Sequence, residues 1–325
     1  MTLGLLLLAA FFAVMQRCRE AFSAGESLAG LQDNARHALS VIVPDIEHAG
    51  FFGFAGSSAS YTRGGTVLAE GAQLRQPDAT HLVAAVPGLP AGAHDCGVNF
   101  AVDLELGVEG DNNSYATGAA ATRCAPTASA GGAHAGADTL TLRHASLDVT
   151  KPLAGRLQLY SRRLESQAAG ELFADGRSPG PTDANAEVRD LEVRKYYIAN
   201  DSVDRRAWPA LRVKALTESR GAAQFRDEEV LPGVEDLQVE LGVRDPGDIE
   251  GRLSFVAPDF PELRTRTVVA VRLWLRIRAD RTEAGYFDAR PLRYADVEFV
   301  PGELESRQRR MLVQRTIALR NPRQP

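Results

Sequence analysis

The chain opens on the apolar segment LGLLLLAAFFAVM, residues 3–15, and continues without an intervening proline into SLAGLQDNARHALSVIVPDIEH, residues 27–48. In the second segment, apolar residues recur at steps of three and four, which places them on one face of an α-helix. That face comprises Leu28, Leu31, Ala35, Ala38, Leu39, Ile42 and Ile46. Because no turn signal separates the two segments, the sequence predicts one helix of about 45 residues that ends near Gly50 and Gly53.

Such a helix is on the order of 70 Å long, more than a globular domain needs. Pro44 removes one backbone hydrogen bond, so we expect it to kink the last turns or to end the straight part. The apolar first third, residues 1–16, and the amphipathic remainder, residues 17–50, are typical of a segment that lies partly in a membrane and partly on a globular head. A membrane span needs about 20 apolar residues, so a signal anchor followed by an ordinary surface helix is the alternative interpretation.

Alternation of apolar and polar residues with a period of two recurs after residue 135 and predicts half-buried strands. The alternating stretches centre on Leu140 and Leu142, on Leu157 and Leu159, and on residues 237–243, 269–277 and 311–319. Strands with one face on a core and one in water form mainly antiparallel sheets. The amphipathic part of the leading helix is available to cover the apolar face.

The predicted fold class is therefore α+β, with residues 1–50 as the helix and residues 51–325 as one β-rich head with long loops. Residues 116–137 are almost entirely small, so we expect a mobile surface loop there. Residues 174–186 carry two glycines and two prolines and predict a second loop. Both loops interrupt the sheet and do not divide the head into domains.

Composition excludes several classes of protein. Of the 325 residues, 44% are hydrophobic, which rules out wholesale disorder. The net charge is -5. Binding to nucleic acid regardless of its base sequence needs a basic surface, so no nucleic-acid partner is expected. The chain lacks a Walker loop, a dinucleotide-binding glycine motif and a nucleophile elbow. The sequence thus predicts a protein that is not an enzyme.

The three cysteines and six histidines form no local metal motif, so no metal and no cofactor are predicted. His94 and Cys96 are half a site at most, and the carboxylates of residues 245–251 fit a hairpin turn better than a calcium loop. A disulfide between Cys96 and Cys124 would contribute roughly 3 kcal/mol and would persist in an oxidising compartment. Two free thiols are the alternative. Cys18 follows the apolar run and has no local partner.

Taken in order, these segments resemble the PilW-type minor pilins of bacterial type IV pili. The segments LGLLLLAA and LAGLQDNARHALSVIVPDIEHAGFFGF are similar to the family's helix and to its exit into the head. The segments that resemble successive strands of the head are GADTLTLRHAS, VRKYYIAND, VLPGVEDLQVELGV, VVAVRLWLRIRA and RRMLVQRTIALRN. The resemblance covers nearly the whole chain, and it rests on the order and spacing of the segments.

The resemblance implies a pilin-type helix, an inner-membrane anchor, a periplasmic head and a later place in the pilus tip. It implies as partners other minor pilins, the major pilin, the inner-membrane assembly machinery and a tip adhesin, and as processes pilus priming, twitching motility and adhesion. The membrane and filament-core surface would comprise Leu3, Leu5, Leu6, Leu7, Leu8, Phe11, Phe12 and Val14. The residues that dock the helix on the sheet would be Leu28, Leu31, Leu39, Ile42 and Ile46.

The chain departs from the family at its start. Family precursors begin with a short basic leader that ends in glycine, followed by an aromatic residue and a glutamate within the apolar run, and this sequence shows none of these. We therefore expect either a true start upstream of Met1 or a copy that cannot be processed. Two alternative functions stay open: an adhesin-like head that binds through its loops, and a minor pseudopilin of a type II secretion machine.

Overall fold

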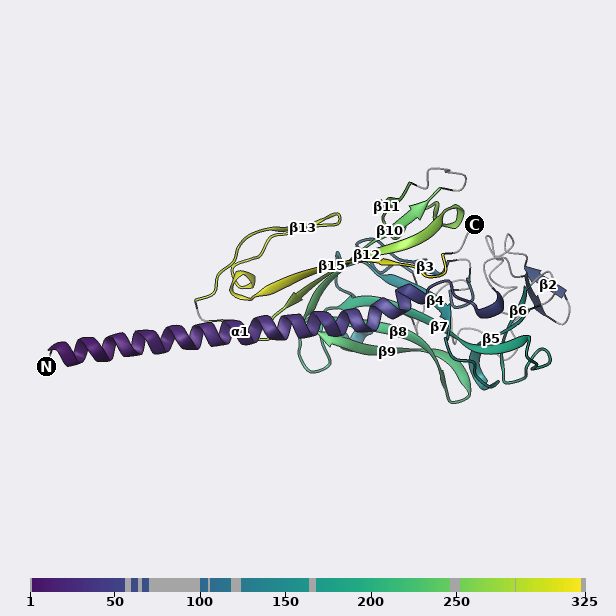
Figure 1. Cartoon of the computed structure of the whole chain (residues 1–325), viewed down its shortest axis with the longest axis horizontal. Helices are drawn as coiled ribbons and strands as arrows, with labels where there is room; N and C mark the ends of the chain where they lie inside the picture. Colours follow the sequence, from purple (N-terminus) through teal and green to yellow (C-terminus); the bar gives the residue numbers. More distant parts are fainter. Residues whose placement is uncertain are drawn as a thin grey trace.

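A computed structural model describes residues 2–55, 60–63, 66–69, 100–104, 106–117, 124–163, 168–245, 252–283 and 285–322. Helix α1, Thr2–His48, leads into a body of β-strands, and its N-terminal half projects away from that body (Figure 1). The α+β class predicted from the sequence is thereby confirmed. Short 3-10 helices lie at Gly53–Ala55, Ala128–Ala130, Leu263–Thr265 and Glu305–Arg307.

The larger sheet has nine strands in the order β2-β1-β6-β5-β7-β4-β3, and β8 and β9 extend it from β7. Its strands are β1 (Ser60–Arg63), β2 (Thr66–Ala69), β3 (Val108–Glu109), β4 (Leu140–Ala145), β5 (Ala154–Arg163), β6 (Ala168–Asp175), β7 (Ala186–Ala199), β8 (Ala210–Ser219) and β9 (Ala222–Pro232). All these pairs are antiparallel except β1 with β6. The long strand β7 holds the sheet together, because β5, β4 and β8 all pair with it.

The second sheet has four antiparallel strands in the order β11-β10-β12-β15. They are β10 (Val234–Arg244), β11 (Ser254–Val256), β12 (Thr267–Arg278) and β15 (Arg310–Ala318). A separate hairpin of β13 (Leu292–Tyr294) and β14 (Val297–Phe299) follows β12 and reaches back along α1 (Figure 1). The strands expected from the alternating pattern are β4, β5, β10, β12 and β15.

One core joins the helix to both sheets. Leu31, Ile42 and Ile46 of α1 pack in one cluster with apolar residues of β4, β7 and β8 and with those of β10 and β12. Full burial of one such side chain contributes about 1.5–3 kcal/mol, so the C-terminal half of α1 belongs to the folded head.

The expectation of one water-facing side is wrong for β4 and β10. All six residues of β4 are buried, and so are the polar residues Glu235, Asp236 and Gln238 of β10. Glu235, Asp236 and Gln238 each have a hydrogen-bond or ionic partner within the protein, as in the bond from the Gln238 amide nitrogen to Gly136 O (2.8 Å). His144 Nε2 and Gln238 Oε1 are the exceptions among the polar atoms of these two strands, because they are buried without a hydrogen-bond partner. Paired polar groups tolerate burial, which the alternating pattern alone does not reveal.

Helix α1 runs through Pro44 and ends at His48, so the proline does not terminate it. Gly50 then adopts a φ of +80°, which suits glycine, and its N–H donates to Arg143 O at 2.9 Å. A Cβ atom on Gly50 would lie 2.8 Å from Asn321 O. The helix end predicted near Gly50 is therefore confirmed, and the backbone beyond it is held directly by β4.

The prediction of a mobile surface loop at residues 116–137 is wrong for its described part, residues 116–117 and 124–137. Cys124, Ala130 and Ala137 are buried there. The backbone N–H of His134 donates to Ile198 O at 2.7 Å, which fixes the segment to β7. Small side chains let the backbone approach the strand closely, so the same composition that suggested mobility permits packing. Residues 118–123 lie outside the described residues.

Candidate interaction surface of the leading helix

The N-terminal half of α1 carries large apolar side chains in contact with solvent. The exposed fractions are 66% for Leu7, 55% for Leu8, and 61% each for Phe11, Phe12 and Val14. These five were predicted to form the membrane and filament-core surface; the side chains of Leu3, Leu5 and Leu6 lie outside the described set. An apolar surface of this kind marks a site that binds a membrane or another protein.

The exposed apolar surface continues along the helix toward the head. Met15, Phe22 and Leu28 are all exposed, and Cys18 is exposed with a free thiol. Within the described part of the chain, none of the helices combines the length and the apolar character that a membrane span requires. The surface therefore extends well beyond the apolar run and reaches the edge of the head.

The residues expected to dock the helix separate into two groups. Leu31, Ile42 and Ile46 lie in the core, and Leu39 is half-buried and packs against it. Leu28 departs from the expectation, because it is 41% exposed and lies one turn before the buried Leu31. The amphipathic periodicity thus extends one turn further than the surface that covers it.

Polar contacts hold the helix to the head at both ends of the docked half. Near its start, Ser27 donates a hydrogen bond to Glu283, whose pKa is lowered chiefly by Arg309. Near its end, Arg320 pairs with Glu47 at 2.6 Å. Ser27 and Glu283 are both half-buried, whereas Arg320 is exposed and its ion pair with Glu47 contributes at most about 1 kcal/mol. These contacts determine where the helix lies on the head and add little to the free energy of folding.

A buried contact lies between them. Asp45 of α1 accepts two hydrogen bonds from Arg194 of β7, at 2.9 and 3.0 Å, and one from the Tyr196 hydroxyl. Burial raises the pKa of Asp45, but His144, Arg194 and Tyr196 outweigh it and hold that pKa below the usual value. Asp45 therefore remains ionised at neutral pH and ties the last turn of the helix to β7.

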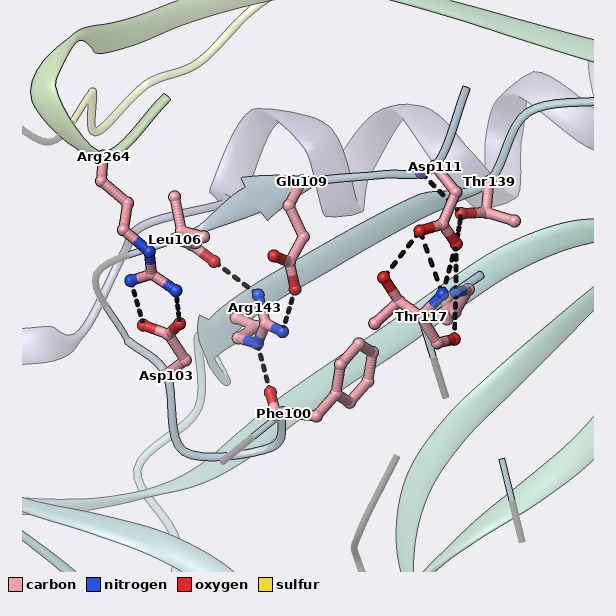
Figure 2. Close-up of polar contacts among 10 residues, drawn as sticks. Phe100, Asp103, Leu106, Glu109, Asp111, Thr117, Thr139, Arg143 and Arg264 are labelled. Atoms are coloured by element: carbon pink, nitrogen blue, oxygen red, sulfur yellow. Dashed lines mark hydrogen bonds and ion pairs between the residues drawn. The ribbon is translucent and has the colours of Figure 1, made fainter. Parts of the chain in front are cut away.

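Two further polar clusters attach residues 100–117 to the larger sheet, as Figure 2 shows. Arg143 of β4 donates to Phe100 O at 2.6 Å, to Leu106 O at 2.7 Å and to the Glu109 carboxylate. In the second cluster, the Lys195 ammonium donates to Asp111 at 2.8 Å.

In the second cluster, the described charged groups are all engaged in hydrogen bonds with one another or with their neighbours. Asp111 also accepts hydrogen bonds from Thr117 and Thr139, and Lys195 also donates to Thr117 O at 2.7 Å. Burial raises the pKa of Asp111, but Lys195 and the two threonines bring it below its usual value. A carboxylate and an ammonium that are paired in this way are structural, so the cluster fastens a long connection to β7.

Asp138 gives the fold a pH dependence. Its carboxylate is buried and accepts the N–H groups of Asn113 at 2.7 Å and of Val239 at 2.8 Å. Burial nevertheless raises its pKa to about 7. Because this pKa exceeds the unfolded value of about 3.9, the group favours the folded state at low pH, and that contribution is lost as pH rises toward 7.

We compare the free energy of unfolding of the wild type with that of Asp138→Asn. The difference, wild type minus variant, should fall by up to about 1.4 kcal/mol per pH unit between pH 5 and pH 7. The measurement is urea unfolding of both proteins at pH 5, 6, 7 and 8. The difference between the two proteins isolates Asp138 from the other titrating groups. A difference that stays constant across this range would mean that the carboxyl is already ionised at pH 5.

Two sequence predictions fall partly on residues outside the described part of the chain: the disulfide and the carboxylate-rich turn. Cys124 is buried, whereas Cys96 and His94 lie outside the described residues, so the Cys96–Cys124 disulfide stays a prediction. Residues 246–251, which include most of the carboxylate-rich turn weighed as a calcium loop, lie outside them as well.

Comparison with known proteins adds one match. Residues 195–321 match the family model of PilW, described as Type IV Pilus-assembly protein W. The match confirms the resemblance to the PilW family over the end of β7 and over β8 to β15, and it does not extend to α1. Neither the curated proteins nor the solved structures gave a match to the chain.

Proposed function

We propose that this chain is a non-enzymatic minor pilin that acts in type IV pilus assembly. The leading helix carries the proposal, because an exposed apolar half continues without a break into a half that is buried in the head. The match of residues 195–321 to the pilus-assembly family W supports it independently, since that match lies in the head alone.

The arrangement of helix and head suggests a separate role for each part of the chain. Residues 1–16 form the membrane and filament-core surface, residues 17–50 the amphipathic part, and residues 51–325 a periplasmic head. Before assembly, Leu7, Phe11 and the neighbouring apolar side chains face the inner membrane. In the pilus they pack against the helices of other subunits, so van der Waals contacts between helices replace contacts with lipid.

The proposed partners are other minor pilins, the major pilin and the inner-membrane assembly machinery. Together the minor pilins prime the filament and then occupy its tip, where a tip adhesin binds them. Twitching motility and adhesion depend on this step. The rigid connection between helix and head suits such a role, because a force applied to the head passes to the helix through the shared core.

The exposed thiol of Cys18 allows a direct test. We expect a photoreactive maleimide attached to Cys18 to crosslink, in inner-membrane preparations, to other pilin-like proteins that mass spectrometry identifies. The Cys18→Ser variant, treated in the same way, reports labelling at any other site. If the crosslinked partners are pilins of the pilus, the proposal is supported. If they are pseudopilins of a secretion machine, the secretion alternative takes its place. Recovery of the full chain as a soluble periplasmic monomer contradicts both.

A further inference from the structure

Three potential metal ligands meet where α1 ends on the larger sheet. Asp45 comes from the last turn of the helix, His144 from β4 and Glu192 from β7. Strand pairing places His144 directly opposite Glu192. One ligand atom from each of the three residues lies within 4.8 Å of the other two. Asp45 and His144 are buried, and Glu192 is half-buried.

The imidazole of His144 has an unused nitrogen that points into this cluster. Its Nδ1 lies 3.0 Å from Ala145 O, and because a carbonyl only accepts, Nδ1 carries the hydrogen in the neutral ring. Its buried Nε2 has no hydrogen-bond partner. Nε2 lies 3.7 Å from Asp45 Oδ1, which is too long for a hydrogen bond. Metal-binding histidines commonly donate their other N–H to a backbone carbonyl in this way.

Arg194 orients the two carboxylates and leaves part of each available. It donates to both oxygens of Asp45 and, at 2.7 Å, to Oε2 of Glu192. No described donor contacts the other oxygen of Glu192. Burial lowers the pKa of His144, but Asp45 and the Ala145 carbonyl outweigh it and raise that pKa above its usual value. A cation therefore has to displace the ring proton, and once the ring is neutral the two carboxylates outweigh the one guanidinium. Arg194 would thus hold both carboxylates in place without contacting the ion itself.

We propose that Asp45, His144 and Glu192 bind a divalent transition-metal ion, Zn²⁺ in the first instance. One imidazole nitrogen and two carboxylate oxygens are a ligand set that zinc accepts, with water in the fourth position, whereas calcium and magnesium prefer oxygen alone. Metal binding requires the neutral imidazole and so displaces any proton held between His144 and Asp45.

His48 lies beside this cluster. Its ring centroid is 6.1 Å from that of His144, and its Nδ1 lies 2.7 Å from Pro44 O, which leaves its Nε2 for a ligand. A bound ion would connect the last turn of α1 to β4 and β7 at a single point. Sequence reasoning missed this site, because its three ligands come from α1, β4 and β7 and show no local spacing that would indicate a metal motif.

Calorimetric titration of ZnCl₂ into the purified full-length chain, in detergent and after removal of metals, tests the site. The Cys18→Ser background removes the exposed thiol as a competing ligand. We expect one ion per chain and a rise in the melting temperature with zinc. Glu192→Gln and His144→Ala should each weaken zinc binding at least about tenfold, whereas His37→Ala, an exposed histidine on the same helix, should leave it unchanged.

Glu192→Gln is the decisive variant, because Glu192 is half-buried and its replacement keeps the size of the side chain. If His144→Ala fails to fold, Glu192→Gln still decides the question. Absence of stoichiometric zinc binding, or binding that Glu192→Gln leaves unchanged, overturns the proposal. Cobalt absorption in the visible range supplies a second readout, since an imidazole–carboxylate site gives a spectrum that the Glu192→Gln protein should lose. None of these outcomes depends on pilus assembly.

Discussion

Replacement of both Phe11 and Phe12 by aspartate is expected to abolish pilus assembly in a strain whose only copy of the gene carries the change. Both rings are exposed on the projecting half of α1, and they pack edge to face with centroids 6.2 Å apart. A carboxylate near the centre of a bilayer costs about 2.5–3.5 kcal/mol. Two of them should reduce the amount of surface pili at least about 100-fold, measured as sheared pilin on an immunoblot.

Gln32→Asp/His37→Asp is the matched control, because it places two aspartates on exposed polar positions of the same helix outside residues 1–16. This variant should retain piliation. The head should also fold normally in the Phe11→Asp/Phe12→Asp protein, since neither ring belongs to its core, and an unchanged melting temperature would verify this. Normal piliation by the double variant would exclude the apolar half of the helix as the assembly surface.

The helix and the strands were predictable because each depends on a local pattern. Residues 27–48 repeat apolar side chains with the helical period, and residues 237–243 and 269–277 alternate with the strand period. Gly50 marked the helix end because only a left-handed φ lets the backbone turn there. Leu28 shows the limit of the pattern: periodicity gives the apolar face of a helix, but the extent of the head decides how much of that face is covered.

Features that depend on contacts distant in sequence were not predictable. The burial of Lys195 requires Asp111, and the burial of Arg143 requires two carbonyl groups and Glu109. The strand pattern shows a charged residue at each place and therefore suggests a water-facing side. The cluster of Asp45, His144 and Glu192 was missed for the same reason. The helical surface was found because its apolar residues are consecutive.

Arg143→Met should destabilise the fold by about 3–5 kcal/mol. Arg143 is only 1% exposed, and its guanidinium also lies over the Phe100 ring at 4.7 Å. Its removal leaves the carbonyls of Phe100 and Leu106 without their donor and Glu109 without its counter-ion, and an unpaired buried partner is what makes such changes costly. In a domain of this size the loss should lower the melting temperature by roughly 10 °C.

The control is Arg293→Met, which removes an arginine from an exposed ion pair with Glu298 and should cost less than about 1 kcal/mol. Adding Glu109→Gln to Arg143→Met separates the two causes of the loss. If the uncompensated carboxylate dominates, the double variant should regain at least about 1 kcal/mol, because the amide has no charge to desolvate. If the unpaired carbonyls dominate, no recovery should follow. A loss below about 1 kcal/mol in Arg143→Met itself would mean that residues 100–117 are held mainly by the Lys195–Asp111 pair and by their apolar contacts.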